Sequence, residues 1–304
     1  MRVSTQHLFE SGGARIGELQ SSMLKTQQQI ASGRRILSPS DDPIGAARAL
    51  EITQTQALNT QFSTNRAHAK NAMGELDGIL AGVTELLQDV KTTVISARNG
   101  SVTDVERGFM ASELQGRFDQ LLGMANSRDA AGNYLFSGFQ TDTAAFIASP
   151  SGATYQGDSG QRLIQVDSTR QLAANATGQS VFQGGGQDMF QTLNDLVTLL
   201  QTPVVTPADT AALKTGLDTA NGNLDLALDN VSTTRASVGT RMQELDTLDL
   251  AGEDRGVQYS QMLSEIQDLD YAKAITQLSQ QQVTLEAAQK SFVKSSGLSL
   301  FNFI

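Results

Sequence analysis

Apolar residues recur every three or four positions over most of the chain, and this spacing predicts long amphipathic helices. The steps are unbroken from Met73 to Ala97, and they return from Leu217 to Val231. Both stretches are typical of helices that pack together as a coiled coil. We therefore expect a helical bundle in the middle of the chain.

Two weaker seams lie near the ends of the chain. The first contains Ile16, Leu19, Met23, Gln27 and Ile30. The second contains Tyr271, Ile275, Leu278, Gln282, Leu285, Gln289 and Phe292. It lies in a stretch from Val257 to Lys294 without Pro or Gly, which predicts one long helix. Glutamine at seam positions weakens the contact that each helix can make.

The order of the segments predicts that the two end helices pair antiparallel, because the chain runs outward and then returns. Such a pairing closes a very long loop and has a large entropy cost. Weak seams and this cost together predict ends that become ordered only on assembly. In the alternative interpretation, the end helices pack on the body of the subunit as ordinary amphipathic helices.

The segment SGRRILSPSDDP, from Ser32 to Pro43, predicts a rigid connection after the first helix. Gly33 is suited to end that helix, and Asp41 or Asp42 can cap the next one, with Pro43 in its first turn. Capping explains the two carboxylates, so a paired-carboxylate enzyme site is the weaker interpretation. The residues singled out in this motif loop are Gly33, Arg34, Arg35, Pro39, Asp41, Asp42 and Pro43.

The helical spacing stops near Asn133, where the chain becomes rich in aromatic and β-prone residues. Residues 154–156 and 161–166 predict a hairpin with the four-residue turn Gly157–Gly160. The expected fold is mainly α, with long antiparallel helices that form a terminal coiled coil and a helical bundle, plus a small β-rich insert. We expect three parts: residues 1–42 with 257–304, residues 43–139 with 184–256, and residues 140–183.

Composition excludes several classes of function. The 304 residues include no Cys and carry a net charge of −10, which excludes disulfides and thiolate metal sites and argues against general nucleic-acid binding. No apolar run is long enough to predict a membrane span, and the N-terminal residues do not have the pattern of a signal peptide. Composition alone therefore indicates a cytoplasmic protein. Asp225 and Asp229 lie one helical turn apart, but a solvated face explains them better than a cation site. His7 and His68 have no accompanying catalytic set.

Four motifs point to a known family. They are MRVSTQ at residues 1–6, SGRRILSPSDDP at 32–43, NYLFSGFQTD at 133–142 and LSLFNFI at 298–304. Together they resemble the flagellar hook-associated protein 3 family of hook–filament junction proteins, which are relatives of flagellin. The Asp-Asp-Pro loop is shared with flagellins, whereas the Tyr-Leu-Phe-Ser-Gly segment and the aromatic end favour the junction family.

The resemblance implies a structural, non-enzymatic role without a cofactor. Members of the family form a short helical layer between hook-associated protein 1 and the first flagellin subunits. They are exported unfolded by the flagellar type III apparatus without a cleaved signal peptide, which replaces the cytoplasmic expectation with an extracellular one. An export chaperone is expected to hold the C-terminal region, and the absence of Cys suits threading of an extended chain.

The residues expected to make assembly contacts are apolar side chains of the two ends. They are Leu8, Ile16, Leu19, Met23, Ile30, Ile266, Ile275, Leu278, Leu285, Phe292, Leu298, Leu300, Phe301, Phe303 and Ile304. The expected partners are further copies of the chain, hook-associated protein 1, flagellin and the chaperone, with no nucleic acid and no membrane. A filament-forming flagellin is the alternative; an enzyme and an adhesin that binds through the insert are weaker ones.

Overall fold

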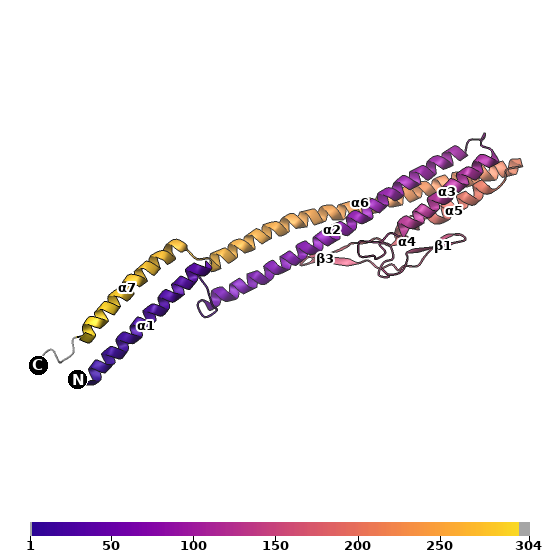
Figure 1. Cartoon of the computed structure of the whole chain (residues 1–304). Helices are drawn as coiled ribbons and strands as arrows, with labels where there is room; N and C mark the ends of the chain where they lie inside the picture. The colour runs from indigo at the N-terminus through magenta and orange to yellow at the C-terminus, as the bar shows by residue number, and fades with distance from the viewer. Residues whose placement is uncertain (1, 298–304) are drawn as a thin grey trace. The chain divides into compact units, whose positions relative to one another are not determined.

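The computed structural model describes residues 2–297 and forms two compact units (Figure 1). One unit contains residues 1–59 and 253–304, and the other contains residues 60–252. The described helices are α1 (Arg2–Ser32), α2 (Pro43–Ala97), α3 (Asp104–Ala125), α4 (Gly178–Phe182), α5 (Met189–Gln201), α6 (Pro207–Gln267) and α7 (Tyr271–Gly297). The strands are β1 (Phe146–Ser149), β2 (Gly152–Tyr155), β3 (Leu163–Asp167) and β4 (Arg170–Ala173). The mainly α fold with a small strand region is confirmed; the three-part division of the chain stays a proposal.

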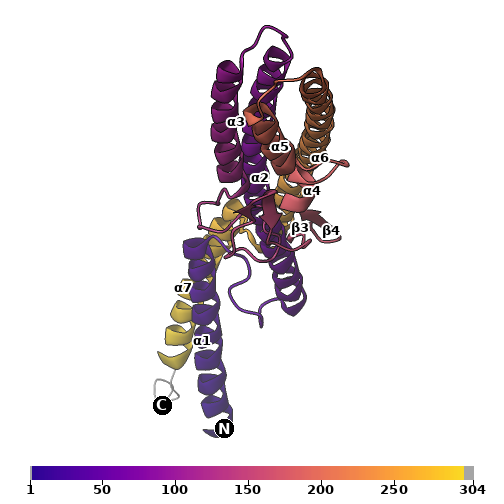
Figure 2. The same cartoon turned by 90° about the vertical axis from the view of Figure 1, so that its right-hand side faces the viewer.

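A helical bundle forms the body of the unit of residues 60–252 (Figure 2). The apolar steps predicted between Met73 and Ala97 are all buried in its core, together with Leu217, Leu224 and Val231 of α6. Helix α3 packs on α5 and begins with a capping box. The Thr103 side chain and the Glu106 carboxylate there satisfy backbone amides that the first helical turn leaves free.

Ion pairs connect α2, and Arg98 directly after it, to α6 in this unit. The pairs are Arg66–Asp249 at 2.5 Å, Lys70–Asp246, Asp77–Arg235 at 2.9 Å, Lys91–Asp225 and Arg98–Asp218 at 2.5 Å. Residue numbers rise on α2 as they fall on α6, so the helices run antiparallel. Asp225 is thus paired with a lysine rather than sharing a cation with Asp229.

The strands form two separate antiparallel hairpins, and the predicted pairing of residues 154–156 with 161–166 is wrong. β1 pairs with β2 across Pro150 and Ser151, and β3 pairs with β4 across Ser168 and Thr169. Residues 157–160 do not form the hairpin turn. Instead Asp158 Oδ1 accepts hydrogen bonds from the amides of Phe139 (2.9 Å) and Gly160 (2.7 Å), which ties this segment to the chain before β1.

Aromatic side chains join the strand region to the bundle. Phe146 of β1 lies 4.7 Å from Phe190 of α5 and 5.5 Å from Phe182 of α4, measured between ring centroids. Phe118 of α3 and Phe136 extend the cluster on either side. These rings belong to the same buried core as the apolar seam of α2. Packing, rather than sheet hydrogen bonding alone, therefore holds these short hairpins, since isolated two-stranded hairpins are marginal in water.

The long helix expected from Val257 to Lys294 is interrupted. α6 continues to Gln267, and α7 starts at Tyr271 after a three-residue break. Asp270 accepts a hydrogen bond from the Lys273 amide at 3.1 Å, as an N-cap residue does. This aspartate is the signal in the sequence from which the break could have been predicted.

Phe190→Ala should destabilise the unit of residues 60–252 by about 3–5 kcal/mol, because it removes a fully buried ring from the aromatic cluster. Phe109→Ala is the matched control, since that ring is 71% exposed and its loss should change stability by less than about 0.5 kcal/mol. Urea unfolding followed by circular dichroism measures both. Equal losses for the two variants would contradict the assigned core.

Candidate assembly site

Helices α1 and α7 lie side by side and antiparallel within one unit, as predicted (Figures 1 and 2). Three contacts fix their register. The rings of Phe9 and Phe292 meet edge to face at 4.9 Å, and Gln281 Nε2 donates to Ser22 Oγ at 2.9 Å. At the other end of the pair, Gly33 lies against the hydroxyl of Tyr271.

The seam between α1 and α7 is partly displaced from the predicted one. Its least exposed positions are Gly12, Ile16, Leu19, Met23, Thr26 and Ile30 on α1, and Ala274, Leu278, Gln281, Leu285, Ala288 and Phe292 on α7. The apolar positions predicted on α1 are therefore confirmed, as are Leu278, Leu285 and Phe292. The prediction was wrong for Gln27, Gln282 and Gln289, which are exposed, and for Tyr271 and Ile275, which are about half exposed.

Small side chains explain the displaced positions. Thr26, Ala274 and Ala288 occupy seam positions that a search for large apolar residues passes over. Gly12 shows the same constraint, because a Cβ atom there would lie 2.6 Å from the ring of Phe292. A heptad count that admits Ala, Thr and Gly at the seam would have found this register.

Apolar side chains also face away from the seam. Ile275, Val283 and Val293 of α7 and Leu24 of α1 are each more than half exposed. Among the other expected assembly residues, Ile266 is partly buried in the last turn of α6. The side chain of Leu8 lies outside the described residues, as do Leu298, Leu300, Phe301, Phe303 and Ile304.

The motif loop between α1 and α2 is held by its two aspartates. Asp41 Oδ2 accepts hydrogen bonds from the amides of Leu37 and Ser38, both at 3.1 Å, and Asp41 Oδ1 accepts one from Lys25 Nζ at 2.6 Å. The ammonium group of Lys25 and the Ser38 and Leu37 amides lower the pKa of Asp41. These contacts make the carboxylate a structural anchor of the loop.

Asp42 caps α2, as predicted. Its Oδ1 accepts the Gly45 amide at 2.9 Å, and its carbonyl accepts the Ala46 amide. The Gly45 hydrogen bond lowers the pKa of Asp42, and Arg35 contributes further through a 3.3 Å ion pair. Gly33 has a positive φ of 69° directly after α1, so the predicted helix-ending glycine is also confirmed. Asp42 thus caps the helix while Asp41 anchors the loop, so both carboxylates of the Asp-Asp-Pro motif have structural partners.

Arg35 joins this loop to the break between α6 and α7. Its amide donates to the Gln267 carbonyl at 2.7 Å, and its Nη2 donates to the Ile266 carbonyl at 2.8 Å. The Leu269 amide returns a bond to the Gly33 carbonyl at 3.0 Å. The last carbonyls of a helix lack partners within the helix and carry partial negative charge, so a cation there ends α6 favourably. This non-local contact cannot be read from the local sequence, which shows only the N-cap at Asp270.

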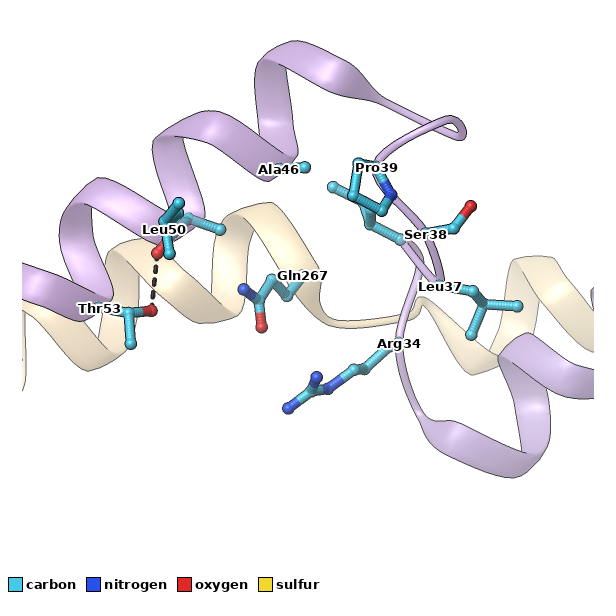
Figure 3. A pocket seen from close by; sticks show the side chains of 10 residues that line it. Arg34, Leu37, Ser38, Pro39, Ala46, Leu50, Thr53 and Gln267 are labelled. Carbon is cyan, nitrogen blue, oxygen red and sulfur yellow. Dashed lines mark hydrogen bonds between the residues drawn. The ribbon is translucent and has the colours of Figure 1, made fainter.

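A pocket of about 260 Å³ opens beside the motif loop (Figure 3). Leu37, Pro39 and Leu50 supply apolar walls, while Arg34 and Gln267 supply polar groups. Leu37 and Leu50 remain 37% and 61% exposed. The lining contains the hydroxyl groups of Ser38 and Thr53 but no His, Asp or Glu side chain.

Residues 2–297 contain neither a metal-binding cluster nor a membrane-spanning helix. Within that range no three His, Asp or Glu side chains lie close enough together to hold a metal ion. In the same part of the chain, no helix combines the length and apolar character needed to cross a membrane. The features that remain are the paired end helices, their outward apolar residues and the motif loop.

Leu285→Asn should loosen α1 from α7, because Leu285 is only 9% exposed and lies in the seam. Val283→Asn is the matched control on the same helix, since Val283 is 68% exposed. Amide hydrogen exchange over residues 16–30 should become at least about tenfold faster in the first variant and stay unchanged in the second. The same rates in both variants would show that the seam is assigned wrongly.

Asp41→Asn should lower the thermal midpoint at pH 7 and have no effect in strong acid. A lowered carboxyl pKa in the folded state means that the unfolded state binds protons first as pH falls. The stabilisation is therefore complete above the ordinary value of about 3.9 and is lost as pH falls through the folded value. The difference in midpoint from the wild type, measured from pH 7 to 2, should disappear. Asp229→Asn, at an exposed position, is the control; a pH-independent difference for Asp41→Asn would contradict the assignment.

Comparison with known proteins gives a consistent relationship. The model of the bacterial flagellin N-terminal helical region matches residues 3–141. Flagellar hook-associated protein 3 of Escherichia coli (strain K12) is 34% identical over 315 residues, covering 99% of both chains. Flagellin of Bacillus subtilis (strain 168) is more distant, at 23% identity over 93% of this chain and 92% of that protein.

A solved structure shows the same arrangement. A flagellar hook-associated protein from Vibrio parahaemolyticus superposes with a TM-score of 0.68 and is 27% identical, covering 75% of this chain and 100% of that one. The full-length identity to the Escherichia coli protein exceeds that to flagellin, and the paired end helices and capped Asp-Asp-Pro loop agree with it. The chain therefore belongs to the flagellar hook-associated protein 3 family.

Proposed function

We propose that this chain is a structural subunit of the bacterial flagellum that joins the hook to the flagellin filament. Copies of it would form a short helical layer, with hook-associated protein 1 on one side and flagellin on the other. The main structural observation behind this proposal is the α1–α7 pair. The residues that form its seam are covered, but Leu24, Ile275, Val283 and Val293 remain exposed. Contacts with neighbouring copies would cover these apolar side chains, and the family relationship supports such an assembly.

The assembly would use heterologous contacts, in which one surface of each copy binds a different surface of the next copy. Heterologous contacts repeated between copies produce a helical tube, and a layer with different neighbours above and below needs different surfaces at its two ends. We assign the end helices to the inner wall of that tube, residues 43–139 with 184–256 to the surrounding bundle, and residues 140–183 to the outer face. Leu298, Leu300, Phe301, Phe303 and Ile304 would pack against neighbouring subunits.

The role needs no catalysis, cofactor or metal. The subunit would act outside the cell at the hook–filament junction, after export by the flagellar type III apparatus and release from a cytoplasmic chaperone. A filament-forming flagellin is the alternative function. Purified protein that polymerises alone into long filaments would favour flagellin, whereas a subunit limited to a short layer supports the junction role.

Ile275→Asp should abolish firm filament attachment in cells that lack the wild-type protein, because it places a charge on the outward apolar surface of α7. Gln282→Asp is the matched control, since that exposed position is already polar. Both proteins should be exported and should have the same helical content. Electron microscopy of flagella and the amount of flagellin in the medium measure the result. Firmly attached filaments with Ile275→Asp would contradict the proposed surface, and normal filaments without any copy of the protein would contradict the junction role.

A further inference from the structure

A second feature lies in the unit of residues 60–252, where α2 ends and α3 begins. A cavity of about 540 Å³ opens there, between this turn and the connection from α5 to α6. Val102, Val204 and Leu213 form an aliphatic part of its lining. Arg98, Arg107 and Lys214 form a cationic part. The cavity thus combines an apolar surface with an excess of positive charge, in a protein whose net charge is −10.

Arg107 is the buried cation of the cavity. Its side chain is 6% exposed; Nη1 donates to the Val102 carbonyl at 3.0 Å, and Nη2 pairs with Asp104. Its third nitrogen, Nε, is buried and has no hydrogen-bond partner among the described residues. The Val102 carbonyl and Asp104 thus hold the guanidinium of Arg107 at the wall of the cavity.

The other two cations differ in how they are neutralised. Arg98 pairs with Asp218 at 2.5 Å, while Lys214 takes part in no ion pair within residues 2–297. Asp104 is the one carboxylate in the lining, and Asp218 outside it neutralises Arg98, so one positive charge remains in excess at the three cations. A ligand with a single negative charge would reduce this excess and could accept hydrogen bonds from the cationic wall.

The aliphatic lining determines which anion fits. Free phosphate would use the cations and leave Val102, Val204 and Leu213 without a partner. An acidic side chain flanked by aliphatic residues would use both parts of the lining. Val105 and Val205 directly follow lining residues in the chain and are 68% and 83% exposed, so aliphatic surface continues outside the cavity. We propose that this cavity is a docking site for an Asp or Glu side chain on an aliphatic segment of a partner protein.

The binding test uses the full chain with labelled methyl groups and three probes at constant ionic strength. The probes are the blocked tripeptides acetyl-Leu-Asp-Leu-amide and acetyl-Leu-Asn-Leu-amide, and inorganic phosphate. The Asp peptide should shift the methyl resonances of Val102, Val204 and Leu213 and bind at least about tenfold more tightly than the Asn peptide, since charged hydrogen bonds are the stronger ones. Phosphate should leave those methyl groups unchanged at the same concentration.

Two variants locate the site while retaining Arg107. Arg98→Gln with Lys214→Gln should weaken binding of the Asp peptide by at least about tenfold and leave the thermal midpoint within about 2 °C. Lys290→Gln, at an exposed lysine paired with Glu286, is the control and should bind as the wild type does. Equal binding of the Asp and Asn peptides, a response to phosphate alone, or unchanged binding by the double variant would each overturn the proposal.

Discussion

The contact between the motif loop and the end of α6 is the constraint on which the rest of the unit of residues 1–59 and 253–304 depends. Arg35 donates to the carbonyl of Ile266 in α6, 231 residues further along the sequence, so closing this contact orders a very long loop. The entropy cost of closing a loop grows only with the logarithm of its length. A single closure brings together both the capped loop and the helix break, so this cost arises once for the two of them. Because Arg35 binds the last carbonyls of α6, that helix ends at Gln267. Helix α7 then starts beside α1, and the two helices pair.

The sequence predicted the parts of the fold that depend on local spacing. The seam from Met73 to Ala97 is strictly periodic and fully buried, because large apolar residues at every step leave one register. The cap at Asp42 and the left-handed Gly33 were likewise predictable, since backbone chemistry within a few residues determines them. The prediction was wrong where contacts with distant residues take part: the break before α7 combines the cap at Asp270 with bonds from Arg35, and Asp158 binds the segment before β1 instead of forming a turn.

The candidate surface was predicted in part for the same reason. Ile16, Leu19 and Leu285 lie in the seam because they are large and regularly spaced. Thr26 and Ala274 were missed because hydropathy does not distinguish a small residue that permits close approach from one on a solvent face. The core of the second unit differs in kind. There Phe146 and Phe190 join strands and helices through ring packing, so a buried core of large side chains stabilises that unit. The end helices, in contrast, contact each other along a single line of side chains.

The tied breaks between α1 and α2 and between α6 and α7 have a mechanical consequence. Two helical segments are interrupted at the same level, and hydrogen bonds from Arg35 and Leu269 connect the interruptions. Neither connection can therefore bend without moving the other, and a load applied to one chain segment is divided between two. A movement of either connection relative to the other would have to break these hydrogen bonds, so the two connections behave as one mechanical element.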